Sequence, residues 1–354
     1  MNSHKPSALL SQRTEQAVSL RFRLICSFAL LIIAMMGMMP VSAQGDAALA
    51  ERTSVTLMLD FSPNTNHTGF YVAQANGYYD AMNLDVEILE PADLAAEQAV
   101  SAGIVEFGIG FQEFSTFAIV DDADVVSIAA IIQENTSGFA AIAADHPLET
   151  PADIAPLTYG GFSFPSLENA MIRELLACEG IDWDAGNYLD VGFADPIELM
   201  SRERIDYAWI FYAWQGIGAE VRDIDLSTLL LSDYNDCIPN YYTPILLTSG
   251  EMIDKNPDVV RAFTHATAQG YALAIENPEA AANILVEAVP QLDAALVEES
   301  AAWLAPRYRG EAARWGEQDI AVWQGFTDFL VENEIIEADA LDVEAVFTNE
   351  FLPE

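Results

Sequence analysis

The chain has 354 residues, of which 14 are Lys or Arg and 55 are Asp or Glu, so its formal net charge at pH 7 is −41. This charge repels phosphate backbones and anionic lipid headgroups, so neither nucleic acid nor an acidic membrane surface is an expected partner. The composition is 52% hydrophobic, which indicates a chain that buries sizeable cores, and the length favours two lobes.

The first 43 residues have the pattern of a cleaved export signal. Arg21 and Arg23 precede an apolar run over 24–39, and residues 41–43 (Val-Ser-Ala) form a small-residue cleavage motif. The run has about 16 residues, fewer than the ~20 of a spanning helix, which argues against a retained anchor. We therefore expect cleavage near Ala43 and an exported protein, periplasmic or at the outer face of the cytoplasmic membrane. Removal of four bases and one acid leaves a mature charge of −44.

The chain contains three cysteines. Cys26 lies in the apolar run without the small-residue surroundings of a lipid-anchor motif, so the mature chain keeps Cys178 and Cys237. These two could pair in an oxidising compartment or remain as buried free thiols, and the sequence leaves both possibilities open. No cysteine pair has metal-ligand spacing, and no metal site is expected.

The first half of the mature chain alternates short apolar runs with amphipathic stretches. This pattern predicts strands and helices in turn, at 55–59, 68–76, 86–89, 94–102, 107–111, 113–120, 125–132 and 139–144. A turn-rich stretch at 146–153 then separates this series from the next. Such alternation is typical of an α/β lobe with a mostly parallel sheet.

A second α/β series follows, and a helical region ends the chain. The expected strands and helix of the second series are at 157–160, 166–179, 207–211 and 242–247. Apolar stripes of helical period then predict helices at 257–275, 278–289, 294–305 and 318–333. No Gly/Ser linker separates the series, so we expect two lobes joined by short crossings that suit a hinge.

One segment carries a resemblance to a known family. Residues 59–69 read LDFSPNTNHTG and are followed by YVA at 71–73 and GYY at 77–79. Further motifs are FGI at 107–109, IAAIIQENTSG at 128–138, YGG at 159–161, DYAWIFYAWQG at 206–216, YYTP at 241–244 and TNEF at 348–351. In their order and spacing they resemble substrate-binding proteins of ABC importers, in the branch that binds thiamine pyrimidine precursors.

The resemblance implies a two-lobed α/β fold of the periplasmic-binding-protein type (type II), with a ligand cleft between the lobes and C-terminal helices. We expect a first lobe over 44–144, a second over 145–244, and a return to the first lobe with the helices over 245–354. It also implies a monomeric, non-enzymatic binder of formylaminopyrimidine or hydroxymethylpyrimidine, without a cofactor, that serves an ABC permease and its ATPase. Riboflavin, a sulfonate or another small heterocycle is the alternative ligand.

Open parallel sheets bind ligands at the carboxyl ends of their strands, and several of the motifs lie there. The aromatic candidates for stacking on a flat ligand are Phe61, Phe162, Tyr212 and Trp214, each of which could instead pack in a core. Trp209, in mid-strand, is expected in the core. The smaller polar and backbone candidates are Asn66, His67, Asn135, Thr136, Ser137 and Gly161.

Three further candidates are a carboxylate or an amide, and each has two possible roles. Glu168 could stabilise the first turn of its helix or pair with a ring nitrogen and an exocyclic amine. Glu113, with Gln112 beside it, has the same two roles, and Gln215 is the third candidate. Relatives of this type commonly carry Trp at the positions of Phe61 and Phe162, and some carry Glu at that of Gln215, which weakens the inferred ligand but not the fold.

A catalytic function is the rival hypothesis. A eukaryotic relative of this fold synthesises the pyrimidine with pyridoxal phosphate, iron, a His in the loop comparable to that of His67, and a CCCFC segment. The corresponding segment here, 236–242, has one cysteine, and a Schiff base would need Lys255, the only lysine of the mature chain. We therefore expect no enzymatic activity.

Overall fold

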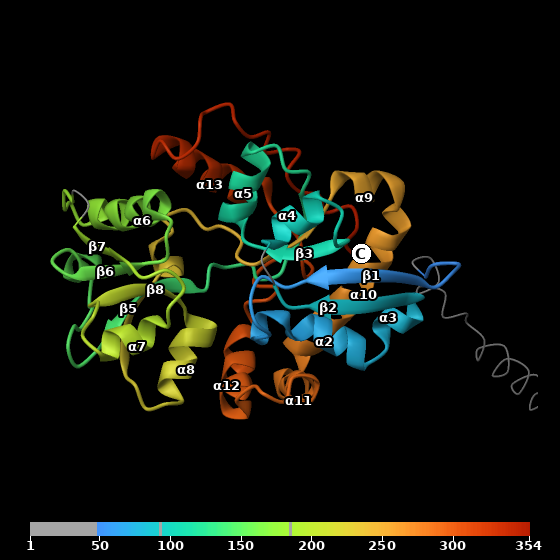
Figure 1. Ribbon diagram of the computed structural model, residues 1–354, viewed down its shortest axis with the longest axis horizontal. Coiled ribbons are helices and arrows are strands. Elements are labelled where there is room, and N and C mark those ends of the chain that lie inside the picture. Colours follow the sequence, from blue (N-terminus) through green and yellow to red (C-terminus); the bar gives the residue numbers. More distant parts are fainter. Residues whose placement is uncertain (1–47, 92–93, 184–185) are drawn as a thin grey trace, which may run out of the picture. The chain divides into compact units, whose positions relative to one another are not determined.

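The computed structural model describes residues 48–91, 94–183 and 186–354. The predicted export signal lies outside this range. Two five-stranded sheets organise the described chain (Figure 1). The first has the order β2-β1-β3-β10-β4, formed by Leu84–Leu89, Thr53–Met58, Phe107–Gly110, Ile245–Thr248 and Val126–Ala130. The second has the order β7-β6-β8-β5-β9, formed by Asn187–Asp190, Thr158–Gly161, Tyr207–Phe211, Ser137–Ile142 and Leu226–Leu230.

Helices cover both sheets. Those of the first lobe are α2 (Thr68–Ala75), α3 (Tyr78–Ala81), α4 (Ala96–Ser101), α5 (Gln112–Val120), α9 (Gly250–Lys255), α10 (Pro257–Glu276) and α11 (Pro278–Ala288). Those of the second lobe are α6 (Pro165–Cys178), α7 (Pro196–Ser201) and α8 (Ile217–Glu220), and the chain ends with α12 (Ala294–Leu304) and α13 (Ile320–Glu332). The single turns are η1 (Thr65–His67), η2 (Pro151–Ile154), η4 (Leu231–Tyr234) and the π-helical η3 (Tyr212–Gly216).

In each sheet a single strand runs against the others. β10 is antiparallel to β3 and β4, and β5 is antiparallel to β8 and β9, whereas the β1–β2, β1–β3, β6–β7 and β6–β8 pairs are parallel. The reversed strands are those by which the chain enters each sheet from the other. The mostly parallel α/β architecture expected from the sequence is confirmed, and the reversed strands bring their amino ends to the carboxyl edge of their sheets.

The chain passes between the sheets twice, through residues 131–136 (the first crossing) and 235–244 (the second crossing). The Ile131 N–H donates to the Pro244 carbonyl at 3.0 Å. The Asn240 side chain donates to the Gln133 carbonyl at 3.0 Å and accepts from the Asn135 N–H at 2.9 Å. The sequence analysis put the end of the first lobe at 144, but β5 already pairs in the second sheet from Ser137, so the chain changes sheets at 131–136.

Each lobe has its own buried core. In the first, Phe107 stacks on Phe263 of α10 with ring centroids 3.9 Å apart, and in the second, Phe139, Tyr159 and Tyr207 pack ring against ring. Helix α13 contributes to both lobes, since Phe326 joins the core of the second whereas Trp323 packs with strand β10 of the first. Within the described residues, no helix is both long and apolar enough to cross a membrane.

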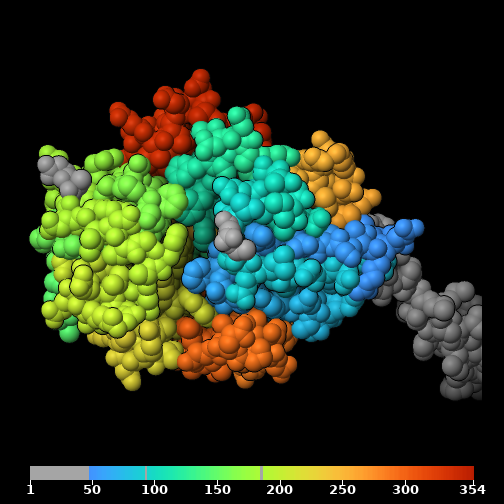
Figure 2. Space-filling view, in the orientation of Figure 1, coloured from blue at the N-terminus to red at the C-terminus, as the bar shows by residue number. Residues whose placement is uncertain are grey.

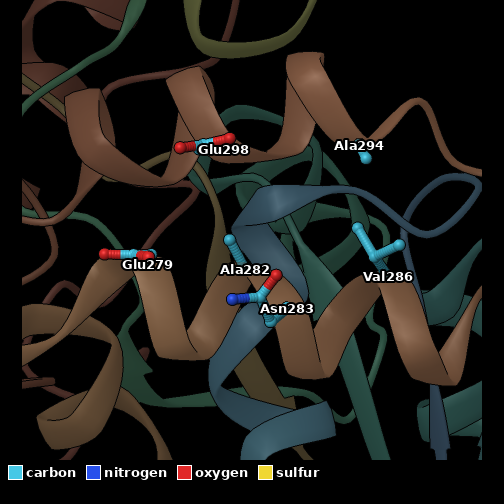
Figure 3. Close-up of a pocket in the computed structure, with 6 residues that line it drawn as sticks. All are labelled: Glu279, Ala282, Asn283, Val286, Ala294 and Glu298. Carbon is cyan, nitrogen blue, oxygen red and sulfur yellow. The ribbon is translucent and has the colours of Figure 1, made fainter.

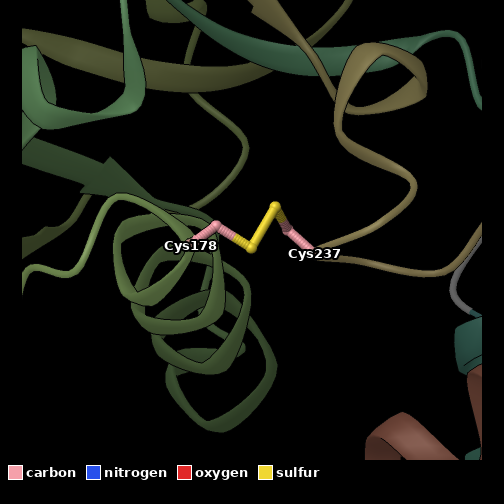
Figure 4. Close-up of a disulfide and its surroundings, with 2 residues drawn as sticks. All are labelled: Cys178 and Cys237. Carbon is pink, nitrogen blue, oxygen red and sulfur yellow. A yellow bond between two sulfur atoms is a disulfide. The ribbon is translucent and has the colours of Figure 1, made fainter.

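A disulfide joins Cys178, at the end of α6, to Cys237 in the second crossing, with Cα atoms 5.9 Å apart (Figure 4). The structure thus selects the paired form of the two possibilities that the sequence left open. Cys178 is exposed and Cys237 half-buried, so the alternative of two buried thiols does not match their surroundings. The bond fixes the start of the second crossing to the second lobe.

Candidate functional site

Loops from the carboxyl edges of both sheets meet beside the two crossings. Phe111, directly after β3, stacks on Phe211 at the end of β8, with ring centroids 5.6 Å apart and an interplanar angle of 21°. Phe114 of α5 contacts Phe164, in the loop after β6, at 4.5 Å. The carboxyl edges of the two sheets, where the ligand is expected to bind, therefore lie close together. Figure 2 shows the second lobe, in green and yellow, meeting the first lobe and α12, in orange.

These rings belong to a longer chain of aromatic contacts, here called the aromatic seam: Phe211, Phe111, Phe114, Phe164, Phe162 and Trp209. Successive ring centroids are 4.5–6.0 Å apart. The seam passes from the second lobe to the first and back again. Its phenyl rings are half-buried or exposed, whereas Trp209 is buried. A row of accessible ring faces and edges between two lobes suits a flat, apolar-faced ligand.

Beside the seam lies a group of buried side chains whose polar atoms lack partners. The first turn of α5 supplies Gln112 Nε2 and Glu113 Oε2, the first crossing supplies Asn135 Nδ2, and the second supplies the Tyr241 hydroxyl. All four side chains are 0–3% exposed. Buried polar groups in native proteins are nearly always hydrogen-bonded, so such a cluster indicates a place for a ligand or water. We call these four residues the polar set.

Local contacts hold the polar set in place. The Gln112 backbone N–H donates to the Tyr242 carbonyl at 3.0 Å, and its side-chain carbonyl accepts from the Tyr242 N–H at 2.8 Å. Asn135 Oδ1 accepts from the backbone N–H and the hydroxyl of Ser137 at 2.8 and 2.6 Å. These contacts use the acceptor ends of both amides, so the free ends of Gln112 and Asn135 are donors.

Glu113 is the acidic member of the set. Its pKa is raised to about 8: burial raises it most, its own backbone N–H lowers it, and the nearby Glu97 carboxylate of α4 raises it. The pKa of Tyr241 is also raised, first by burial and then by the charge of Glu113, which indicates that the two groups lie near each other. Asn135 and Ser137 lower the Tyr241 pKa, although neither contact has hydrogen-bond geometry.

Glu168 lies in the second lobe, and its contacts match the first of its two possible roles, which is to stabilise the start of its helix, α6. Its Oε1 accepts from the backbone N–H groups of Phe162 and Phe164 at 2.9 and 3.2 Å, which fixes the loop before α6. Oε2 faces the hydroxyl of Tyr188 across Gly161, where a Cβ would lie 2.3 Å from that hydroxyl and 2.4 Å from Oε2. Burial raises the Glu168 pKa. Gly161 is thus needed for this close approach.

The loop after β1 places its candidates differently. Phe61 is 52% exposed, which excludes the core-packing alternative for this ring. His67 is fully buried; its Nε2 lies 2.6 Å from Asp60 Oδ1 and its Nδ1 accepts from the Asn64 N–H at 3.2 Å. Both ring nitrogens therefore have protein partners. Asn66 is half-buried, and its carbonyl accepts from the Tyr271 hydroxyl at 2.6 Å.

The π-helical turn η3 directs its candidates towards α12 rather than towards the seam. Tyr212 packs against Trp303 at 5.2 Å and donates to Glu220, while Trp214 packs with apolar residues of α11 and α12. The Gln215 side chain accepts from the Phe211 N–H at 2.7 Å. On the same side Arg307 stacks on Trp303 at 3.6 Å. Thus the structure groups Glu113, Asn135, Ser137 and Phe162 near the seam and Tyr212 and Trp214 at α12.

Two residues considered in the sequence analysis remain to be placed, Thr136 and Trp209. Thr136 is buried, and its carbonyl accepts from the Tyr212 N–H at 3.0 Å, so the first crossing is bonded to η3. Trp209 is buried as expected, but its Nε1 has no partner. Sequence reasoning missed Phe111, Phe114, Phe164, Phe211 and Tyr241. The aromatic repeat at 111, 114 and 117, at the end of a strand and the start of a helix, was the available signal.

A hollow elsewhere in the molecule does not resemble this site. A hollow of about 90 Å³ between α11 and α12 is lined by Glu279, Ala282, Asn283, Val286, Ala294 and Glu298 (Figure 3). It has two carboxylates and no aromatic face. Over the described residues, no three His, Cys, Asp or Glu side chains are grouped to hold a metal ion.

Comparison with known proteins places the chain among characterised sequences. A family model described as NMT1/THI5 like matches residues 64–281. A formylaminopyrimidine-binding protein of Halalkalibacterium halodurans is 26% identical over 320 residues, which cover 88% of this chain and 94% of the relative. A 4-amino-5-hydroxymethyl-2-methylpyrimidine phosphate synthase of Legionella pneumophila is 25% identical over 307 residues, with 86% and 93% covered.

The fold also matches a solved structure. The periplasmic aliphatic sulphonate binding protein SsuA of Escherichia coli superposes with a TM-score of 0.66 over 85% of this chain and 94% of that chain, at 14% identity. At this identity the similarity establishes the fold alone. The two-lobed periplasmic-binding-protein architecture inferred from the sequence is therefore confirmed.

Proposed function

The chain belongs to the NMT1/THI5-like family, and we propose that it is the extracytoplasmic solute-binding component of an ABC importer for a thiamine-precursor pyrimidine, formylaminopyrimidine or hydroxymethylpyrimidine. The ligand would bind between the lobes and favour the conformation in which the lobes are in contact. The binding proteins among its relatives and fold neighbours support the importer role.

The observation that carries this proposal is the polar set beside the aromatic seam. A pyrimidine needs ring faces or edges to pack on and a few fixed donors and acceptors around its rim. Phe111 and Phe114 flank Gln112 and Glu113 on the chain, so rings and polar atoms come from one short segment. Asn135 and Tyr241 add polar atoms from the two crossings.

The family also contains synthases, and three features of this chain favour binding over synthesis. His67 has both ring nitrogens engaged by Asp60 and Asn64. Lys255, at the end of α9, is exposed and paired with Glu251. Cys237, the single cysteine of the 236–242 segment, is in a disulfide. His67 and Cys237 therefore have protein partners, and Lys255 lies at an exposed helix end rather than in a buried site.

The importer role implies the remaining features of the proposal. The protein would be exported and cleaved near Ala43, act as a monomer, and deliver its ligand to a membrane permease driven by a cytoplasmic ATPase. Contact between the lobes in the ligand-bound form would present both lobes to the permease.

Thermal unfolding of residues 44–354 with a ligand panel tests the proposal. The panel holds hydroxymethylpyrimidine, formylaminopyrimidine, thiamine, riboflavin and an alkanesulfonate. A ligand present at 100 times its Kd stabilises by about 2.7 kcal/mol, which is a readily measured shift. Phe111→Ala should reduce the shift, whereas the matched control Phe193→Ala, at a ring that is 84% exposed in the second lobe, should not.

The panel separates the alternatives. A shift with the pyrimidines alone supports the proposal. A shift with riboflavin or the sulfonate retains the importer role and replaces the ligand. Turnover of a pyrimidine precursor by the purified chain would replace binding with catalysis.

A further inference from the structure

Glu113 is a buried carboxyl group whose partner is missing from the protein. It is 3% exposed, its Oε2 has no hydrogen bond, and no basic side chain in the described part of the chain contributes to its environment. The titratable groups close enough to interact with it electrostatically are Glu97 of α4 and Tyr241 of the second crossing. An ionised carboxylate in such surroundings is strongly disfavoured.

The other two buried glutamates near the lobe edges have structural partners. Glu97 accepts from the Ser115 hydroxyl at 3.0 Å, and Glu168 accepts from two backbone N–H groups. Gln215 also uses its acceptor oxygen, on the Phe211 N–H. Glu113 and Glu168 each keep one buried oxygen, Oε2, without a hydrogen bond. In Glu168 this oxygen faces the Tyr188 hydroxyl across Gly161, so of the two we take Glu113, beside the seam, as the acceptor for a ligand.

The neighbours of Glu113 indicate which hydrogen-bonding groups a ligand at this position should have. Phe111 and Phe114 flank it, and the free amide donors of Gln112 and Asn135 belong to the same polar set. A carboxyl group matches the edge of a ring that has a nitrogen acceptor beside an exocyclic N–H donor. The O–H donates to the ring nitrogen while the other oxygen accepts from the amine. The two amide donors remain for acceptor substituents.

We propose that Glu113 recognises an amino-substituted nitrogen heterocycle through this paired contact. In the complex, one proton is shared between the Glu113 carboxyl and the ring nitrogen of the ligand. The proposal rests on the proposed function and names the chemical class of its ligand. The proton lies either on Glu113 or on the ring nitrogen, and the count of protons is the same in both cases. An alkanesulfonate offers no N–H donor and would leave the second carboxyl oxygen without a partner.

A shared proton fixes the pH dependence of affinity. Above about pH 8, where Glu113 of the free protein ionises, binding must take up a proton, so Kd should rise tenfold per pH unit. Below the pKa of the ring nitrogen, binding must release a proton and Kd should rise again. Between these limits Kd should be constant.

Isothermal titration of the purified chain with hydroxymethylpyrimidine from pH 6 to 9.5 tests this dependence. The wild type and the control Glu287→Gln, at an exposed glutamate of α11, should share the profile. Glu113→Gln, whose amide keeps one donor and one acceptor, should bind at pH 7 but lose the rise above pH 8, whereas Glu113→Leu, which has neither, should bind at least tenfold more weakly. An analogue with methyl in place of the amino group should bind the wild type weakly. A Glu113→Leu variant with wild-type affinity, or a Glu113→Gln variant with the wild-type pH profile, overturns the proposal.

A ligand-free measurement separates this proposal from the proposed function. In carbon-13 NMR of glutamate-labelled protein, one carboxyl should titrate near pH 8 and be absent from Glu113→Gln. If that resonance is present but no pyrimidine binds, the proposed ligand is wrong. The role of Glu113 then stands only if another amino heterocycle binds with the same pH dependence of Kd. If Glu113 titrates near its ordinary value, the shared proton is refuted even when a pyrimidine binds.

Discussion

Replacement of Glu113 by Gln should stabilise the ligand-free protein at neutral and alkaline pH. Burial raises the pKa of Glu113 from an ordinary value of 4.5 to about 8, so the folded protein holds a proton that the unfolded chain has lost. Stability from this group is therefore greatest below about pH 4.5 and decreases as pH rises towards 8. The amide in Glu113→Gln has no proton to lose in this range and avoids this decrease.

The size of the effect follows from the difference in pKa. Each pH unit between the two values lowers the free energy of unfolding by about 1.4 kcal/mol, so the wild type loses about 3 kcal/mol between pH 4.5 and 7. The loss is complete near pH 8. This loss of about 3 kcal/mol is an upper value, because separation of the lobes would return the carboxylate to water and remove part of the cost of its burial.

Urea unfolding at pH 5, 7 and 9 measures this difference. Glu113→Gln should gain on the wild type by a few kcal/mol from pH 5 to 9, and X-ray scattering should show the ligand-free wild type, but not the variant, expanding at pH 9. Glu287→Gln, at an exposed glutamate of α11, controls for the loss of a carboxyl group. Equal pH dependence of the wild type and Glu113→Gln would refute the argument from burial.

Three further predictions concern the frame around the site. Replacing both Cys178 and Cys237 by Ser should lower stability by about 4 kcal/mol on the chain-entropy estimate for residues 59 positions apart, measured by urea unfolding with and without reductant. Asn240→Ala should cost about 1–3 kcal/mol and speed amide hydrogen exchange at Asn135, because it removes the bonds between the crossings, whereas the exposed Asn235→Ala should not. A double-mutant cycle of Phe111→Ala and Phe211→Ala should give a coupling of about 0.5–1.5 kcal/mol in unfolding, and a value near zero would mean that the lobes are apart in solution.

The fold was accessible from the sequence because most elements obey a local rule. The predicted helix at 257–275 begins at a proline and keeps one apolar face, and it appears as α10, Pro257–Glu276. The predicted strand at 207–211 is β8, residue for residue. Strands β7 and β9 were missed because they are short and largely exposed or half-buried, so their apolar pattern is weak.

The site was accessible only in part. Position at the carboxyl end of a strand led to Glu113, Asn135 and Phe162, and these do lie near the lobe boundary. The partners of Phe111 and Phe114 are Phe211 and Phe164, about 100 and 50 positions away, and only the placement of one lobe against the other brings them together. No local pattern contains that information. The same holds for the disulfide, whose two cysteines lie in α6 and in the second crossing.

The position of the polar set suggests how a ligand would act on the lobes. The disulfide fixes the second crossing to the second lobe at Cys237, and the bond between Ile131 and Pro244 ties its far end to the first crossing. Movement between the lobes therefore involves the short stretch that contains Tyr241 and the first crossing, which contains Asn135, together with the contacts of α13 to both lobes. A ligand can shift the lobes only through different affinities for their two arrangements. In the proposed site two of its polar contacts, Asn135 and Tyr241, are on the connecting segments themselves, so binding acts directly on the segments that link the lobes.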